Sequence, residues 1–268
     1  MKLVAIVRAP AHADEAARAL ADAAGLTLAE ARMRLAPEPP ALVARLEPDK
    51  ADALVKALRQ ASLAALAVDA HFPTDRDRTI VRSCSWDHRG VTFTSRAGDS
   101  MVVSWGEVVA ILRGVRASRS QVVQAEKSTR FSIGAAVASG GLKMTRTATK
   151  TVRSSEESTE QVILLFARDG GAAVLTEGEV EFSCLGPSMQ PSSTGNMVEL
   201  ARRLRDGAKG AFYDERLLRL GRRPLPFLAG GESRSQTKTA TVTRTDTSSS
   251  LDVLAEVIRQ ALVLGLLL

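Results

Sequence analysis

Aromatic residues and cysteines are scarce in this sequence of 268 residues. Seven Phe, two Trp and one Tyr make up 4% of the chain, so its cores must be built mainly from Ala, Leu and Val. The two cysteines, Cys84 and Cys184, form no CxxC pair, which argues against a disulfide scaffold and against a metal or redox site. Cys184 lies in the mostly apolar run Val180–Leu185, where we expect a buried strand thiol.

Long hydrophobic runs are also missing. The apolar run at the start, Leu3–Val7, is shorter than the roughly 7–15 residues of a secretory signal. The C-terminal stretch Leu251–Leu268 carries Asp252, Glu256 and Arg259, so it lacks the ~20 uninterrupted apolar residues of a membrane span. These absences predict a cytoplasmic protein without a membrane span.

Motifs that carry catalysis, cofactors or metals are absent as well. The three histidines occur in no HExxH or clustered His/Cys pattern, and the sequence contains no GxxxxGK[ST] phosphate loop. Ser85, Asp87 and His88 are close in sequence, but neighbours on a strand point to opposite faces, so they do not predict a catalytic triad. The sequence predicts a non-catalytic protein with no cofactor and no metal, while an enzyme without a recognisable motif stays open.

The first 70 residues predict a small module of strands and helices. Apolar and β-branched runs predict three strands, at residues 2–8, 41–46 and 63–68. An Ala-rich helix ends at Gly25, because a residue without Cβ suits the left-handed position after a helix. Thr27 and Glu30 form a capping box for a second helix, and Pro48 suits the first position of a third. The predicted order is strand, helix, helix, strand, helix, strand.

The segment from Ala24 to Leu58 carries a family resemblance. Its residues include Ala24–Arg32, Ala36-Pro37, Val43 and Ala51–Leu58, in ungapped spacing. In these positions the chain resembles the C-terminal domain of the bacterial ribosomal stalk protein, whose small fold is similar to that of the Clp protease adaptor. The resemblance covers about a quarter of the chain. It implies a partner-binding basic face on the first two helices, where Arg18 and Arg32 stand at matching positions; solvated helix charges are the alternative.

Residues 75–230 predict a β-rich antiparallel domain with a helix near its end. Alternating apolar residues and Gly-containing turns predict strands at 79–83, 91–95, 101–105, 107–112, 118–124, 161–167, 172–176 and 179–185. For residues 107–112 a short helix is the alternative. Asn196 can cap an amphipathic helix, Met197–Arg205. In this order of elements, and in the segment Gly90–Glu107, the chain resembles a pleckstrin-homology-like barrel. A curved sheet with a packed helix is the alternative.

Two Thr-rich stretches interrupt the apolar pattern. Residues 143–153 lie in a polar insertion, 126–158, and residues 237–245 lie in the last segment, 231–268. Alternating Thr favours pleated strands that would pair with each other, whereas a flexible loop is the alternative because such segments bury little apolar surface.

The last stretch, Leu251–Leu268, predicts a helix that is apolar around most of its circumference. Helices of this kind are usually buried. We expect this helix to dock on the rest of the chain or to join two copies in a homo-oligomer, with membrane contact as a third alternative.

Positive charge is concentrated in the middle of the chain. The whole sequence has 36 Lys/Arg and 30 Asp/Glu, a net charge of +6, whereas residues 112–153 contain nine Lys/Arg and one acid, Glu126. With the two helix arginines, the candidate partner-binding residues are Arg18, Arg32, Arg113, Arg116, Arg119, Lys143, Arg146, Lys150 and Arg153. Such cations suit an acidic protein or a solvated face, and through counterion release they also suit nucleic acid.

These observations predict an α+β protein whose role is protein interaction, scaffolding or regulation. The alternative is a nucleic-acid or ribosome-associated protein that binds through residues 112–153. Phe131 is the only aromatic residue of that segment, so the stacking platforms of single-strand binders are missing.

Overall fold

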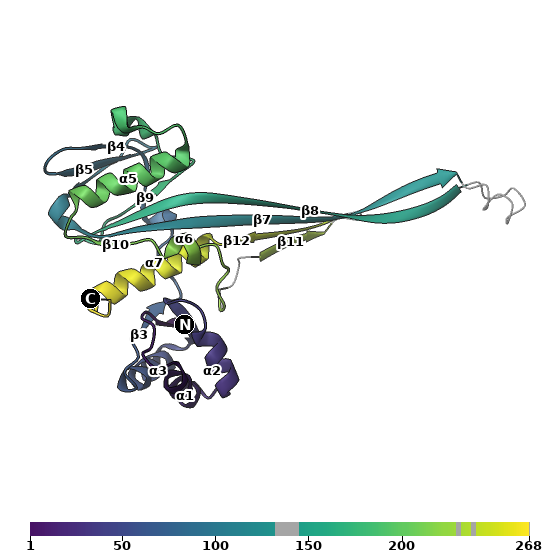
Figure 1. Ribbon diagram of the computed structural model, residues 1–268, viewed down its shortest axis with the longest axis horizontal. Helices are drawn as coiled ribbons and strands as arrows, with labels where there is room; N and C mark the ends of the chain where they lie inside the picture. The colour runs from purple at the N-terminus through teal and green to yellow at the C-terminus, as the bar shows by residue number, and fades with distance from the viewer. Residues whose placement is uncertain (132–144, 229–231, 237–239, 268) are drawn as a thin grey trace, which may run out of the picture. The chain divides into compact units, whose positions relative to one another are not determined.

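The computed structural model of the protein describes residues 1–131, 145–228, 232–236 and 240–267 (Figure 1). The chain forms two compact units. The main unit comprises residues 1–117, 159–229 and 247–268. The second, which we call the basic β unit, comprises residues 118–158 and 230–246. The boundaries of these units differ from those of the domains predicted from the sequence, which were residues 1–70, 75–230 and 231–268. The α+β class predicted from the sequence is confirmed.

The N-terminal part of the main unit has the element order that the sequence predicts. Its elements are β1 (Lys2–Ile6), α1 (Ala13–Ala24), α2 (Leu28–Leu35), β2 (Ala41–Leu46), α3 (Pro48–Gln60) and β3 (Ala65–Asp69). The strands form an antiparallel sheet in the order β2-β1-β3. Gly25 follows α1 at φ +64°, and the capping box is present: the Thr27 hydroxyl accepts from the Glu30 amide, and the Glu30 carboxylate accepts from the Thr27 amide. The resemblance to the stalk domain stays a prediction.

Both faces of this three-stranded sheet are buried. Val4 and Ile6 of β1 share a core with Leu20 of α1 and Leu58 of α3. The alternate residues Leu3, Ala5 and Val7 belong to a different core cluster, which contains residues of the C-terminal helix. Because neighbours on a strand point to opposite faces, β1 holds apolar residues on both sides of the sheet.

The rest of the main unit is a larger sheet with helices. Two long strands, each with residues in both units, are β7 (Val108–Phe131) and β8 (Thr145–Ala167). The shorter strands are β4 (Thr79–Trp86), β5 (Gly90–Ser95), β6 (Ser100–Ser104), β9 (Ala172–Thr176) and β10 (Phe212–Asp214). The helices are α5 (Ser193–Gly207), α6 (Leu217–Leu220) and α7 (Ser248–Val263), and the 3-10 turns are η1 (Asp75–Asp77), η2 (Trp105–Glu107) and η3 (Phe182–Ser188).

The strands of the larger sheet follow one another in the order β7-β8-β9-β4-β5-β6, with β10 parallel to β7. The β8–β9, β4–β5 and β5–β6 pairs are antiparallel, and β4 and β9 are parallel. Helix α5 lies across this sheet (Figure 1). Among the pairings described, β6 pairs only with β5, so closure into a pleckstrin-homology-like barrel is not confirmed.

Helix α7 is buried between the two sheets of the main unit. Ile163 and Leu165 of β8 share a core with α5, whereas Val162, Leu164 and Phe166 share a core with α7 and the N-terminal sheet. Residues 250–258 and 261 of α7 are all buried. The docking alternative for the last helix is therefore confirmed.

The burial of α7 also limits the homo-oligomer that the sequence predicts through residues 251–268. Most of the surface that a second copy would need on residues 251–268 is covered by the chain's own sheets, because α7 lies against both of them. Among the large apolar residues described there, Val263 and Leu264 are exposed, by 72% and 52%. No helix in the described part of the chain is long and apolar enough to cross a membrane.

Two local predictions are wrong. The strand predicted at 179–185 is a turn followed by η3, because the amides of Glu179 and Val180 donate to the carbonyl of Thr176 instead of to a strand ladder. Cys184 is accordingly a half-buried thiol in η3 and not the expected buried strand thiol. Helix α5 is capped by Ser192, whose hydroxyl accepts from the Gly195 amide at 3.1 Å, and not by Asn196. The Asn196 side chain is instead buried and bonds both the amide and the carbonyl of Gln190.

The basic β unit has strands in the order β11-β12-β7-β8, with β11 at Glu232–Gln236 and β12 at Ala240–Asp246. The strand alternative is thus confirmed for residues 145–153 and 240–245, while residues 143–144 and 237–239 lie outside the described chain. The predicted pairing of the two Thr-rich stretches with each other is not observed. Instead β7 lies between β12 and β8, and β7 and β8 run side by side (Figure 1). The expected separate strands at 107–112 and 118–124 are both parts of β7.

Candidate functional site

Two of the nine predicted partner-binding residues, Arg113 and Arg116, have mostly buried side chains that pair with other residues of the main unit. The Arg113 side chain is 9% exposed and donates to Glu215 Oε1 at 2.6 Å and to Gln161 Oε1 at 3.2 Å. The Arg116 side chain is 11% exposed and donates to both carboxylate oxygens of Asp75. A buried guanidinium needs such partners because it cannot lose its proton. Both side chains are therefore mostly buried, and their role in binding a partner stays a prediction.

The two helix arginines, Arg18 on α1 and Arg32 on α2, are exposed. Arg32 donates to Asp14 of α1 at 2.9 Å, with the two side chains 57% and 70% exposed. An ion pair this exposed contributes about 0–1 kcal/mol. A partner could therefore displace it at little cost, and the partner-binding role of Arg18 and Arg32 stays a prediction.

The remaining cations belong to the basic β unit. Arg119 is exposed on β7, Arg146, Lys150 and Arg153 lie along β8, and Lys143 lies outside the described residues. This unit contains ten Lys/Arg and five Asp/Glu, whereas the rest of the chain contains 26 and 25. Five of the six net positive charges of the sequence therefore belong to this unit, and the rest of the chain is close to neutral.

One edge of the basic β unit is a strand with a single neighbour. β11 pairs with β12 over the register Glu232↔Thr245 to Gln236↔Thr241, and no second partner of β11 occurs among the described pairings. β12 in turn pairs with β7, placing Arg244 opposite Ser120 and Thr245 opposite Arg119. An edge strand presents backbone donors and acceptors to an added strand.

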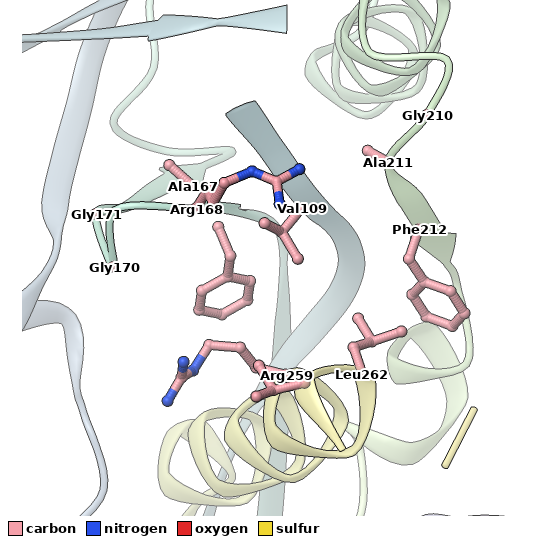
Figure 2. A pocket seen from close by; sticks show the side chains of 12 residues that line it. Val109, Ala167, Arg168, Gly170, Gly171, Gly210, Ala211, Phe212, Arg259 and Leu262 are labelled. Atoms are coloured by element: carbon pink, nitrogen blue, oxygen red, sulfur yellow. The ribbon is translucent and has the colours of Figure 1, made fainter. Parts of the chain in front are cut away.

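A cavity of about 560 Å³ lies in the main unit, at the ends of β8 and α7 (Figure 2). Its lining residues are Val109, Phe166, Ala167, Arg168, Gly170, Gly171, Gly210, Ala211, Phe212, Arg259, Leu262 and Val263. Figure 2 shows Arg168 and Arg259 on opposite sides of the cavity, with the guanidinium of Arg259 pointing away from Leu262 and Phe212. The cavity is thus mostly apolar.

The chemistry available in this cavity is limited. Among the described residues that line it, the two arginines are the only ionisable side chains, so the lining provides no general base and no nucleophile. Arg168 lies 3.3 Å from Glu107 and Arg259 lies 2.7 Å from Glu256, so both cations already have carboxylate partners. Nothing in this arrangement selects an anionic ligand.

A pair of thiols is the feature that the sequence analysis missed. Cys84 Sγ and Cys184 Sγ lie 2.9 Å apart, although 100 positions separate the two residues. No local motif signals this contact, because β4 and η3 meet only through the tertiary fold. Within the described residues, no group of three or more His, Cys, Asp or Glu is arranged to hold a metal ion.

Comparison of the chain with protein-family models, with curated proteins and with solved structures finds no match. The geometry described above is therefore the basis for a functional assignment.

Proposed function

We propose that this chain is a non-catalytic, cytoplasmic protein-interaction protein, with a scaffolding or regulatory role, that binds an acidic protein segment through the basic β unit. The observation that carries the proposal is the segregation of charge: the basic β unit has twice as many Lys/Arg as Asp/Glu, while the rest of the chain is nearly balanced. A concentrated positive field steers and holds a negatively charged partner.

The strand edge supports a protein partner over nucleic acid. An extended acidic peptide can add to β11 through backbone hydrogen bonds while its carboxylates meet the cations of the unit. A nucleic-acid strand has no amide ladder to add to this edge. Phe131 is the only aromatic residue in the unit, so stacking would contribute little to nucleic-acid binding.

The proposal predicts that a defined acidic peptide binds the full chain and that residues of the basic β unit contribute most of the binding free energy. The test is fluorescence anisotropy with labelled poly-glutamate at low salt. We expect the double variant Arg119→Gln/Arg153→Gln to bind roughly 5-fold more weakly, since each ion pair that a peptide carboxylate forms in contact with water contributes up to about 1 kcal/mol. The matched control is Arg82→Gln/Arg96→Gln, two arginines of the main unit that are 51% and 74% exposed; it should change the affinity by less than about 2-fold.

A parallel titration with a labelled RNA and a labelled DNA duplex separates the two partner classes. Tighter binding of nucleic acid than of peptide, with a steep loss of affinity as salt rises and with the same double variant weakening it, would replace our proposal by the nucleic-acid alternative. Equal weakening by both double variants, or no binding of the peptide, would also overturn it.

A further inference from the structure

Cys84 and Cys184 lie on different elements of the main unit. Cys84 lies near the end of β4 and is 8% exposed, whereas Cys184 lies in η3 and is half-buried. Their sulfurs are 2.9 Å apart, and a disulfide requires roughly 2.0 Å. Bond formation therefore needs a shift of less than about 1 Å, which side-chain rotation and small backbone adjustments supply.

The two segments are already held together beside the thiols. The Glu181 amide, just before η3, donates to the carbonyl of Arg82 at 2.6 Å, and the Arg82 side chain donates to the Glu181 carboxylate at 2.8 Å. These contacts fix η3 against β4 two to three residues from the cysteines. The reduced protein is therefore pre-organised for a bond between them.

A cation from a third element lies beside η3. The Arg203 guanidinium of α5 donates to the Leu185 carbonyl at 3.2 Å and to the Ser188 hydroxyl at 2.7 Å, and it lies 5.3 Å from the centre of the Trp86 ring. Its Nε also donates to the Glu199 carboxylate at 3.2 Å, so these contacts hold an ion-paired guanidinium next to the residue that follows Cys184.

The thiols have different environments. The hydrogen bond to Cys184 and burial raise the pKa of Cys84. The hydrogen bond from Cys84 lowers the pKa of Cys184, with Arg203 acting in the same direction, although burial opposes both. Cys184 is thus the more exposed and the more readily ionised of the two, and the thiolate is the form that attacks a disulfide.

We propose that Cys84 and Cys184 form a reversible dithiol–disulfide site that exchanges with low-molecular-weight disulfides such as glutathione disulfide. The Cys184 thiolate attacks one sulfur of glutathione disulfide, its S–S bond breaks, and one glutathione thiolate leaves. Cys84 then loses its proton to solvent and attacks Cys184 Sγ, which releases the second glutathione thiolate. The two protein thiols are oxidised by two electrons, and one glutathione disulfide is reduced to two glutathiones.

The new bond would tie η3 covalently to β4 in a fold that otherwise holds them by non-covalent contacts. The bond closes a loop of about 100 residues, so it constrains the unfolded chain strongly. We expect oxidation to raise the midpoint of thermal unfolding by roughly 5–15 °C. The main unit would then be more stable in an oxidising cytoplasm than in a reducing one.

The test is equilibration of the full chain with mixtures of reduced and oxidised glutathione, followed by intact mass and peptide mapping without reduction. We expect the wild type to lose two hydrogen atoms and to yield a peptide linking Cys84 to Cys184. Cys84→Ser should accumulate one glutathione on Cys184, because the second attack is removed. Cys184→Ser should stay unmodified over the same time, because its remaining thiol is buried.

A second measurement examines Arg203 as a positioning residue. The rate of alkylation of Cys184 in Cys84→Ser is measured against pH, with and without Arg203→Gln. Loss of the positive charge should move the rate profile to higher pH, and Arg203→Lys should restore it in part, which loss of packing alone would not do. Two free thiols in wild type under the most oxidising mixture, a disulfide between two chains, or glutathione on Cys84 in Cys184→Ser would overturn the proposal.

Discussion

Replacing Asp252 with alanine is expected to lower the free energy of unfolding by about 3–5 kcal/mol. Asp252 lies on α7 and is 4% exposed, and its carboxylate accepts a hydrogen bond from Nη1 of Arg78. Arg116 Nη2 lies 3.6 Å from the same carboxylate. Without Asp252, two buried cations would share the single carboxylate of Asp75, and a buried charge that loses its partner is strongly destabilising.

The surroundings of this cluster leave little room for water to compensate. The Arg78 side chain is 1% exposed, and within the described chain the Nε atoms of Arg78 and Arg116 are buried without a hydrogen-bond partner. Burial raises the pKa of Asp252, and the two arginines oppose that rise. A buried ion cluster of this kind adds little net stability when complete, whereas loss of one partner is costly because a buried charge is left uncompensated.

Urea unfolding of the full chain measures this effect. The matched control is Asp206→Ala, which removes a helical aspartate that is 60% exposed and pairs with Arg202; we expect a loss below about 1 kcal/mol. Asp252→Asn keeps an acceptor for Arg78 and should cost less than Asp252→Ala. Equal losses for Asp252→Ala and Asp206→Ala would contradict the assignment of a buried, essential carboxylate.

Leu254→Ala should lower the free energy of unfolding by about 2–5 kcal/mol. Leu254 of α7 is fully buried in the core that α7 shares with β1, β3, β7 and β8. Truncation removes apolar contacts and leaves a cavity between two sheets that are each held by their own hydrogen bonds and so close only partly around it. Leu264→Ala is the same substitution at the end of the same helix, where the side chain is 52% exposed, and it should cost less than about 1 kcal/mol.

The shared core also predicts how the main unit unfolds. Because α7 fills the space between the N-terminal sheet and the larger sheet, loss of Leu254 should shift one cooperative transition that includes both sheets. Hydrogen exchange on the wild type and the variant resolves the two sheets separately. A variant in which the amides of β1 keep wild-type protection while those of β8 lose it would show that the sheets unfold independently.

Local sequence signals were sufficient to predict the N-terminal helices and strands. Gly25 after α1, the Thr27–Glu30 capping box and Pro48 at the start of α3 each act within one turn of chain, so a short window contains their cause. The apolar circumference of the last helix likewise predicted its burial. Where Asn196 was expected to cap α5, Ser192 four residues earlier does so, because four residues of the kinds that cap helices stand near the helix start: Ser192, Ser193, Thr194 and Asn196.

The candidate sites depended on contacts between distant parts of the chain. Arg113, Arg116 and Arg119 follow one another on the same strand, yet Glu215 and Asp75 lie against the first two while the third is exposed. A count of charge along the sequence treats all three alike, since it contains no information about what packs across the strand.

Composition, capping and strand periodicity thus determined the α+β class, the first six elements, the charge of the central segment and the buried character of the last helix. The tertiary structure decided that β7 separates the two Thr-rich strands, that α7 lies between two sheets, and that Cys84 meets Cys184. Backbone propensities and caps act between neighbours in sequence, whereas strand order, buried ion pairs and the thiol contact arise from packing surfaces that no short stretch of sequence contains.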